Sequence, residues 1–462
     1  MTAKTFSHDL NRGLGSAIIE LQTNPNRMQY KDIVLRCCLK DIGYDTQSEG
    51  TKGYYLYTAI RALGVKDEFE DKIIVAFMKR LDHRLFQQLA DIICLYADDG
   101  SEKAKTALRK KYQVLVDQLS KQRTFHHKFC EREQLEYLMI CNVNTYKWSA
   151  FRKCIADAGH ILLKRRDDAC NYYDWFLSHC EGIFGKERIA QYFNTASETS
   201  AEINAFVTAQ NELKKVRKNH SSKRVEQEIT LENYVDKAIE IENDEHTSVN
   251  KNTYASMALS TIRFSRQATK EDLLKLVSII KNEKSDKIRA NLLHVFRRVD
   301  FPADIYSLIE YTESDCEQLQ NIAIDALGRF KDQRVHDLAI KLISAGNVEA
   351  GLPLLKENWS KKDGPLIREH ILPLKKISHA VQMDIAGIYS KHSSKSCGDI
   401  LEHIYRNGEC TFCRWGIVEA LWKSRVLKEH ILNECLYDSY YETQKLATRI
   451  KRKLERDVNI CF

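Results

Sequence analysis

The chain has 462 residues, of which 43% are hydrophobic and 29% are charged, and its 71 basic and 64 acidic residues give a formal net charge of +7. This composition excludes a disordered chain, and only five prolines and 18 glycines argue against a many-turned β-sandwich and favour helices. No apolar run reaches the ~20 residues needed to cross a bilayer, and segment 1–21 carries charges where a signal peptide needs an apolar core. We therefore expect a cytoplasmic protein without a membrane segment.

Residues 1–212 are expected to form an N-terminal helical domain. Apolar residues recur at three- and four-residue spacing, as at Ile73, Phe77 and Leu81, which predicts helices with one buried face. Short polar breaks such as 98–101 separate these stripes, so successive helices should fold back as antiparallel hairpins. Long, aromatic-rich helices are expected between 121 and 202.

The segment 213–230 is predicted to be a charged linker or an extension of the preceding helix. Its density of positive charge suits contact with phosphates or with an acidic protein surface, although it lacks the aromatic residues that stack on bases. The alternative is a solvated segment without a partner. The candidate contact residues are Lys214, Lys215, Arg217, Lys218, Lys223 and Arg224.

Residues 231–462 are predicted to form an array of helical hairpins. One sequence block recurs at 288–296, 319–327 and 413–421. In each copy a basic or amide residue follows an apolar one, and a large apolar residue ends the block. The copies are separated by about 30 residues or by a multiple of that spacing, which is typical of helical repeat proteins. Stacked hairpins of this kind form an extended superhelix with a long groove rather than a deep pocket.

The sequence Ala326-Leu327-Gly328, followed by Asp332 and an apolar stretch at 335–343, resembles the HEAT-repeat family. The resemblance covers roughly 231–459, whereas the N-terminal half is similar to uncharacterised bacterial HEAT-type proteins only distantly. It implies an all-α fold, a right-handed α-α superhelix of helical hairpins of the armadillo-like kind. It also implies a surface that binds macromolecules rather than a catalytic pocket.

The last helix is expected to carry a second basic cluster on the face opposite Leu446, Ile450 and Leu454. A terminal repeat needs a polar outer face, so simple solvent exposure is the alternative to binding. The candidate contact residues here are Arg449, Lys451, Arg452 and Lys453, with Arg456 beside them. Further basic groups at 109–111, 164–166 and 297–298 would line one groove if the superhelix brought them together.

Two residue patterns raise the possibility of a metal. Resemblance to HEAT-like di-iron hydroxylases would imply acidic and histidine ligands repeated over equivalent units. In that family the order is His-Glu, whereas in this sequence it is Glu-His, and the intervals between the pairs are uneven. Buried amphipathic helices are the alternative for these pairs. The Cys410-Thr411-Phe412-Cys413 spacing is that of half a zinc site, and no second pair follows it. The Glu-His pairs are Glu245-His246, Glu369-His370, Glu402-His403 and Glu429-His430.

The sequence lacks the motifs of a nucleotide-binding P-loop, a nucleophile elbow and a zinc protease. We therefore expect a non-catalytic scaffold or adaptor without a cofactor, which binds a macromolecular partner, first of all another protein. The alternative is a nucleic-acid-binding protein that contacts the phosphate backbone through the basic clusters. A metal-dependent enzyme that uses the Glu-His pairs is the least favoured interpretation.

Overall fold

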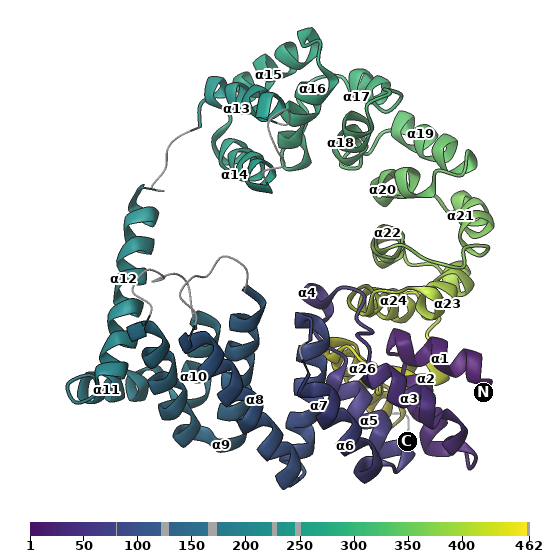
Figure 1. The fold of residues 1–462 in the computed structure, drawn as a ribbon. Helices are drawn as coiled ribbons and strands as arrows, with labels where there is room; N and C mark the ends of the chain where they lie inside the picture. The colour runs from purple at the N-terminus through teal and green to yellow at the C-terminus, as the bar shows by residue number, and fades with distance from the viewer. Residues whose placement is uncertain (80, 122–128, 165–172, 224–228, 245–250, 460–462) are drawn as a thin grey trace. The chain divides into compact units, whose positions relative to one another are not determined.

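The computed structural model contains residues 1–462 and describes all of them except 80, 122–128, 165–172, 224–228, 245–250 and 460–462 (Figure 1). The described residues form helices and no β-strand, which confirms the predicted all-α class. No helix within the described ranges is both long and apolar enough to span a bilayer. By their contacts the residues divide into two compact units: Met1–Val225 with Cys410–Phe412 and Glu429–Phe462, and Glu226–Glu409 with Cys413–Lys428.

The first unit contains the helices of the N-terminal half and the last two helices of the chain. They are α1 (Ala3–Arg12), α2 (Gly15–Thr23), η1 (Arg27–Tyr30), α3 (Lys31–Cys38), α4 (Thr46–Glu49), α5 (Gly53–Leu63), α6 (Lys66–Phe77), α7 (His83–Asp98), α8 (Glu102–Lys121), α9 (Phe129–Lys164), α10 (Asp174–Phe184), α11 (Lys186–Ala196), α12 (Ala201–Lys223), α25 (Glu429–Cys435) and α26 (Tyr441–Asn459).

Local sequence signals set the ends of these helices. Asp82 precedes α7 in an extended conformation, and its carboxylate accepts hydrogen bonds from the backbone N–H groups of Arg84 and Leu85 at 3.1 and 3.0 Å. These two amides have no partner within the helix, so the aspartate stabilises the helix start. Gly64 ends α5 with φ of 81°, a left-handed conformation that glycine adopts without steric cost.

An aromatic core holds α9, α10, α11 and α12 together. The Trp148 ring lies 4.9 Å from Phe151 of the same helix and 5.1 Å from Phe184 of α10, measured between centroids. Phe193 of α11 lies 5.9 Å from Phe206 of α12. Aromatic side chains bury large apolar areas, so this core explains the aromatic-rich composition of the stretch from 121 to 202.

The end of the chain packs on its beginning within the first unit. The backbone N–H of Ser439 donates to the carbonyl of Gly13 at 2.9 Å. A Cβ atom on Gly15 of α2 would lie only 1.8 Å from the backbone oxygen of Glu434 in α25, so the two helices approach as closely as a glycine permits. Residues 429–462 therefore belong structurally with the N-terminal half.

The second unit is a succession of shorter helices. They are α13 (Leu231–Asp244), α14 (Lys251–Gln267), α15 (Lys270–Asn282), α16 (Asp286–Leu293), η2 (His294–Arg297), α17 (Tyr306–Tyr311), α18 (Glu317–Leu327), α19 (Gln333–Ser344), α20 (Val348–Asn358), η3 (Lys361–Asp363), α21 (Gly364–Ile371), α22 (His379–Lys391), η4 (Lys395–Cys397), α23 (Gly398–Asn407) and α24 (Thr411–Lys423), of which 411 and 412 group with the first unit.

Within this second unit, α18, α20 and α22 pack against one another in order, and α19 packs against both α20 and α21 (Figure 1). The three repeated sequence blocks lie on α16 with η2, on α18 and on α24, and their closing residues Phe296, Leu327 and Leu421 are buried. Gly351 departs from the repeat pattern because α19 and α20 approach closely there. A Cβ atom at this position would lie 2.5 Å from the Ile343 side chain.

One half-buried acidic residue, Asp384, is expected to make the stability of the second unit depend on pH. Asp384 of α22 makes no described ion pair, and burial raises its pKa to about 6, with the nearby charges of Asp325 and Glu349 acting in the same direction. Lys356 opposes the shift and does not cancel it. The charged form of Asp384 is therefore destabilised in the folded protein relative to the unfolded chain.

Replacing Asp384 with asparagine should raise the free energy of unfolding at pH 7 by about 1–2 kcal/mol. The native carboxyl holds its proton up to about pH 6, whereas an unfolded aspartate loses it near pH 4. Wild-type stability should therefore fall as the pH rises through this window, and the gain from Asp384→Asn should shrink at lower pH. Urea unfolding between pH 4 and 8 measures this, and the exposed Asp315→Asn substitution is the control. A gain that does not depend on pH would contradict the prediction.

Candidate functional site

The sequence-predicted basic cluster near the C-terminus lies on one face of α26. Residues at helical spacing on this face line a hollow of about 860 Å³. The opposite side of the helix is anchored in the first unit through Leu446, Ala447 and Ile450, which are buried. The residues that line the hollow are Tyr441, Gln444, Lys445, Thr448, Arg449, Arg452, Lys453 and Arg456, referred to below as the cationic face.

The charge on the cationic face is only partly neutralised. Lys445 pairs with Glu442 at 2.9 Å, and this carboxylate raises the pKa of Lys445 above its ordinary value. Arg449, Arg452 and Arg456 form no ion pair with any residue whose side chain the structure describes. Three guanidinium groups therefore remain available to an acidic ligand, and arginine is the side chain best suited to bidentate contact with carboxylate or phosphate.

Exposed aromatic rings lie at the N-terminal end of the cationic face. Tyr441 is 63% exposed, and the Lys445 ammonium group lies 4.2 Å from its ring centroid. Phe412 is also exposed and lies 5.8 Å from the ring of Tyr440, both within the first unit. The surface thus combines arginine with aromatic side chains, the residue types enriched where proteins bind one another.

Sequence reasoning found part of this face. Arg449, Arg452 and Lys453 line the hollow as predicted candidates, whereas Lys451 is exposed but points elsewhere around the helix and is not among the lining residues. Tyr441, Gln444, Lys445 and Thr448 were missed. The signal that identifies them is the three- and four-residue spacing from Tyr441 to Arg456, which a search for dense basic clusters does not detect.

The other basic segment is described only in part. Lys214 and Lys215 are exposed on α12, which continues to Lys223. The side chains of Arg217, Lys218 and Lys223, and the whole of Arg224, lie outside the described residues.

Of the Glu-His pairs that suggested a metal, Glu402-His403 makes polar contacts with other residues of the second unit. His403 Nε2 lies 2.9 Å from the backbone oxygen of Leu374, and Glu402 pairs with Lys428 at 2.5 Å. Glu369 and His370 lie on α21, and Glu429 and His430 on α25, whereas Glu245 and His246 fall outside the described residues.

A histidine that sequence reasoning did not consider lies beside one residue of the Cys-x-x-Cys motif. His379 Nδ1, at the start of α22, is 3.2 Å from Cys413 Sγ in the second unit. Cys410, three residues earlier, is fully buried and groups with the first unit. The imidazole and the Cys413 thiol form a contact that sequence spacing could not reveal, because 34 residues separate them.

Comparison with known proteins finds no family model that matches the chain and no curated protein that matches its sequence. The family resemblance of residues 231–459 therefore stays a prediction.

Proposed function

We propose that the protein is a non-catalytic helical scaffold or adaptor, in which HEAT-like hairpins present binding surfaces to a macromolecular partner. In this proposal the cationic face of α26 binds an acidic segment of a partner protein in the cytoplasm. The exposed lysines at 214 and 215, with the rest of the basic segment 214–224, would be a second docking element. The observation that carries the proposal is the row of three arginines without described ion pairs.

The dimensions of the cationic face suit a short segment of protein. Tyr441 and Arg456 are separated by about four helical turns, which is about 22 Å along the helix axis. An acidic peptide of about seven residues in extended conformation has the same length. Tyr441 and the arginines would supply the aromatic and guanidinium contacts that dominate binding energy in many interfaces.

Nucleic acid is the second candidate, because a row of cations along one helix face also fits a phosphate backbone. Such binding would weaken steeply with salt, since each phosphate contact releases condensed counterions. An acidic peptide would show a shallower dependence because it has no comparable condensed ion atmosphere. The two candidates therefore differ in a measurable slope.

Charge reversal on and off the cationic face tests the proposal. Arg452 lies on the face and Lys451, its neighbour, does not, so Arg452→Glu and Lys451→Glu make the same change of net charge on the same helix. We expect Arg452→Glu to weaken binding of a fluorescent Glu/Asp-rich peptide by about tenfold at low salt, and Lys451→Glu by less than about threefold. Fluorescence anisotropy with the full chain measures both.

The same titration with a short DNA duplex distinguishes the two partner classes. Tighter binding of the peptide at about 0.15 M salt supports a protein partner, and tighter binding of the duplex with a steep salt slope supports nucleic acid. Equal losses from Arg452→Glu and Lys451→Glu would show that net charge, not the cationic face, causes binding. Failure of both probes to bind would remove the cationic face as a docking site.

A further inference from the structure

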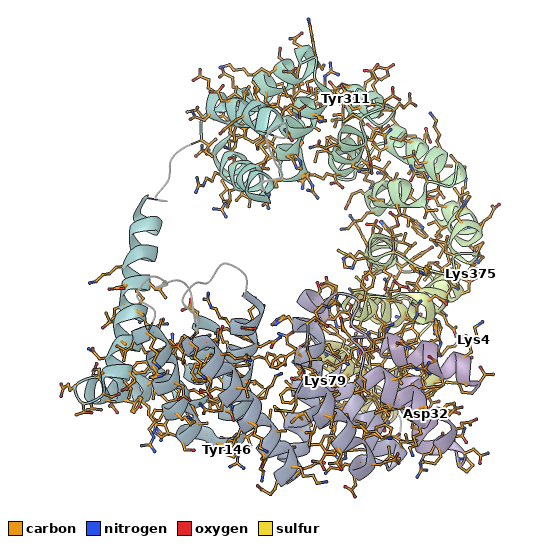
Figure 2. The ribbon with its side chains drawn as sticks, in the orientation of Figure 1. Lys4, Asp32, Lys79, Tyr146, Tyr311 and Lys375 are labelled. Carbon is orange, nitrogen blue, oxygen red and sulfur yellow. The ribbon has the colours of Figure 1, made fainter. Side chains whose placement is uncertain are left out.

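A second cavity of about 520 Å³ lies between α8 and α9 of the first unit. Its deepest residues are Tyr112 of α8 with Asn142, Ala150 and Cys154 of α9, all buried. In Figure 2, Tyr146 is labelled in the part of the first unit where Figure 1 shows α8 and α9. A volume of this size is typical of pockets that hold small organic ligands.

The rim of the cavity carries positive charge and no lining carboxylate. Arg109, Lys110 and Lys153 all line it. Lys153 pairs with Asp157 at 2.9 Å, whereas Arg109 and Lys110 form no ion pair with a residue that the structure describes. The Arg109 guanidinium group instead lies 5.7 Å from the ring centroid of Tyr146. An anion entering the cavity would therefore meet two cations that are not already neutralised.

A strained backbone conformation interrupts α9 between two residues that line the cavity, Tyr146 and Ser149. Lys147 interrupts α9 with φ of 56° and ψ of −134°, which is not helical and is unfavourable for a residue with a side chain. Trp148 to Ala150 then form the first turn of the continuing helix, and Ser149 and Ala150 line the cavity. The first turn of a helix favours negative charge near it, because its amide dipoles point outward.

One polar atom in the wall lacks a partner. The hydroxyl of Tyr146 is buried and makes no hydrogen bond with any described residue. This hydroxyl is closed off from solvent, so Tyr146 offers a ligand its ring rather than a hydrogen-bonding group. The Cys154 thiol at the base of the cavity is neutral, because burial raises its pKa to about 12. The base of the cavity therefore offers apolar contact rather than a nucleophile.

We propose that this cavity binds a small organic anion with a flat apolar body, such as an aromatic carboxylate. The body would lie against Tyr112, Ala150 and Cys154, and the anionic group would face Arg109, Lys110 and the first turn after Lys147. This site is separate from the cationic face of α26 and does not depend on the function proposed for that face.

Binding of 2-naphthoate to the full chain tests this site, with 2-naphthamide as its neutral counterpart. Isothermal titration calorimetry should show saturable binding of 2-naphthoate with one site and a Kd below about 1 mM. The amide should bind at least about fivefold more weakly because it lacks the charge. Arg109→Gln should weaken 2-naphthoate binding to a similar degree, whereas Lys103→Gln, which removes one positive charge from α8 outside the cavity, should alter it less than twofold.

A second variant tests the position of the ligand. Ala150→Leu places a larger side chain in the cavity and should abolish binding, with circular dichroism as the check that the chain remains folded. Arg109 is exposed, so Arg109→Gln keeps the test valid if Ala150→Leu fails to fold. Absence of saturable 2-naphthoate binding, equal binding of the amide, or wild-type binding by Arg109→Gln would overturn the proposal.

Discussion

Replacing Gly159 with alanine should lower the free energy of unfolding of the first unit by about 2–3 kcal/mol. Gly159 is buried in α9 where this helix crosses the start of α12. A Cβ atom there would lie 1.8 Å from the backbone oxygen of Glu202 and 2.4 Å from its carbonyl carbon. Backbone atoms cannot rotate away as a flexible side chain can, so the two helices would have to separate and lose packing in the aromatic core.

Gly182→Ala is the matched control for Gly159→Ala. Gly182 also lies inside a helix of the first unit, α10, but it is exposed and a Cβ atom there would meet nothing within 4 Å. Alanine is the better helix former, so this substitution should stabilise the unit by about 0.5–1 kcal/mol. Hydrogen exchange of peptides from α9 and α12 reports on the first unit directly. Faster exchange in both variants, or in neither, would contradict the predicted close approach.

Replacing Lys52 with methionine should destabilise the first unit by about 3–5 kcal/mol. The Lys52 side chain is only 3% exposed, and its ammonium group donates to the backbone oxygens of Asn11 and Ile42 at 3.0 and 2.9 Å. It lies 3.8 Å from the Glu49 carboxylate, whose side chain is 1% exposed. Without Lys52, a buried carboxylate would lose its counter-ion, and two buried carbonyls would each lose a charged donor.

Comparison with an exposed ion pair isolates the effect of burial. Lys103 pairs with Asp71 at 2.9 Å, but both side chains are about two-thirds exposed, so Lys103→Met should change stability by less than about 1 kcal/mol. Combining Lys52→Met with Glu49→Gln should recover part of the loss, because the amide removes the unpaired charge and can still hydrogen-bond Thr411. Chemical denaturation of the three variants and the wild type measures this. Equal losses of stability in Lys52→Met and Lys103→Met would contradict the argument, as would a double variant that is no more stable than Lys52→Met.

The two candidate sites differ in the kind of ligand that they suit. The cationic face of α26 is long and presents arginines beside an exposed tyrosine, which suits an extended acidic partner. The cavity between α8 and α9 is small, with cations at its rim and apolar groups at its base, which suits a single small anion. The sequence predicts a repeat protein with a long groove and no deep pocket. It did not predict this cavity, because the cavity lies between two helices whose packing is not readable from local patterns.

The sequence by itself determined the helical class of this protein and part of one candidate surface. Apolar spacing such as that of Ile73 and Phe77 predicts buried helix faces, and both residues are buried. The row of Arg449, Arg452 and Arg456 is also readable from the sequence, since residues three and four apart share a helix face. These features are local, because helical periodicity depends only on neighbours along the chain. The superhelical HEAT-like arrangement of 231–459 remains a prediction.

Only the tertiary structure decided which distant segments meet. Thr411 donates a hydrogen bond to buried Glu49 at 2.7 Å, and α25 packs on α2 at Gly15, although more than 350 residues separate each pair. The cavity beside Tyr146 likewise needs α8, α9 and the non-helical Lys147 together. No local pattern specifies such contacts, because the free energy that selects them comes from packing and desolvation across the whole unit.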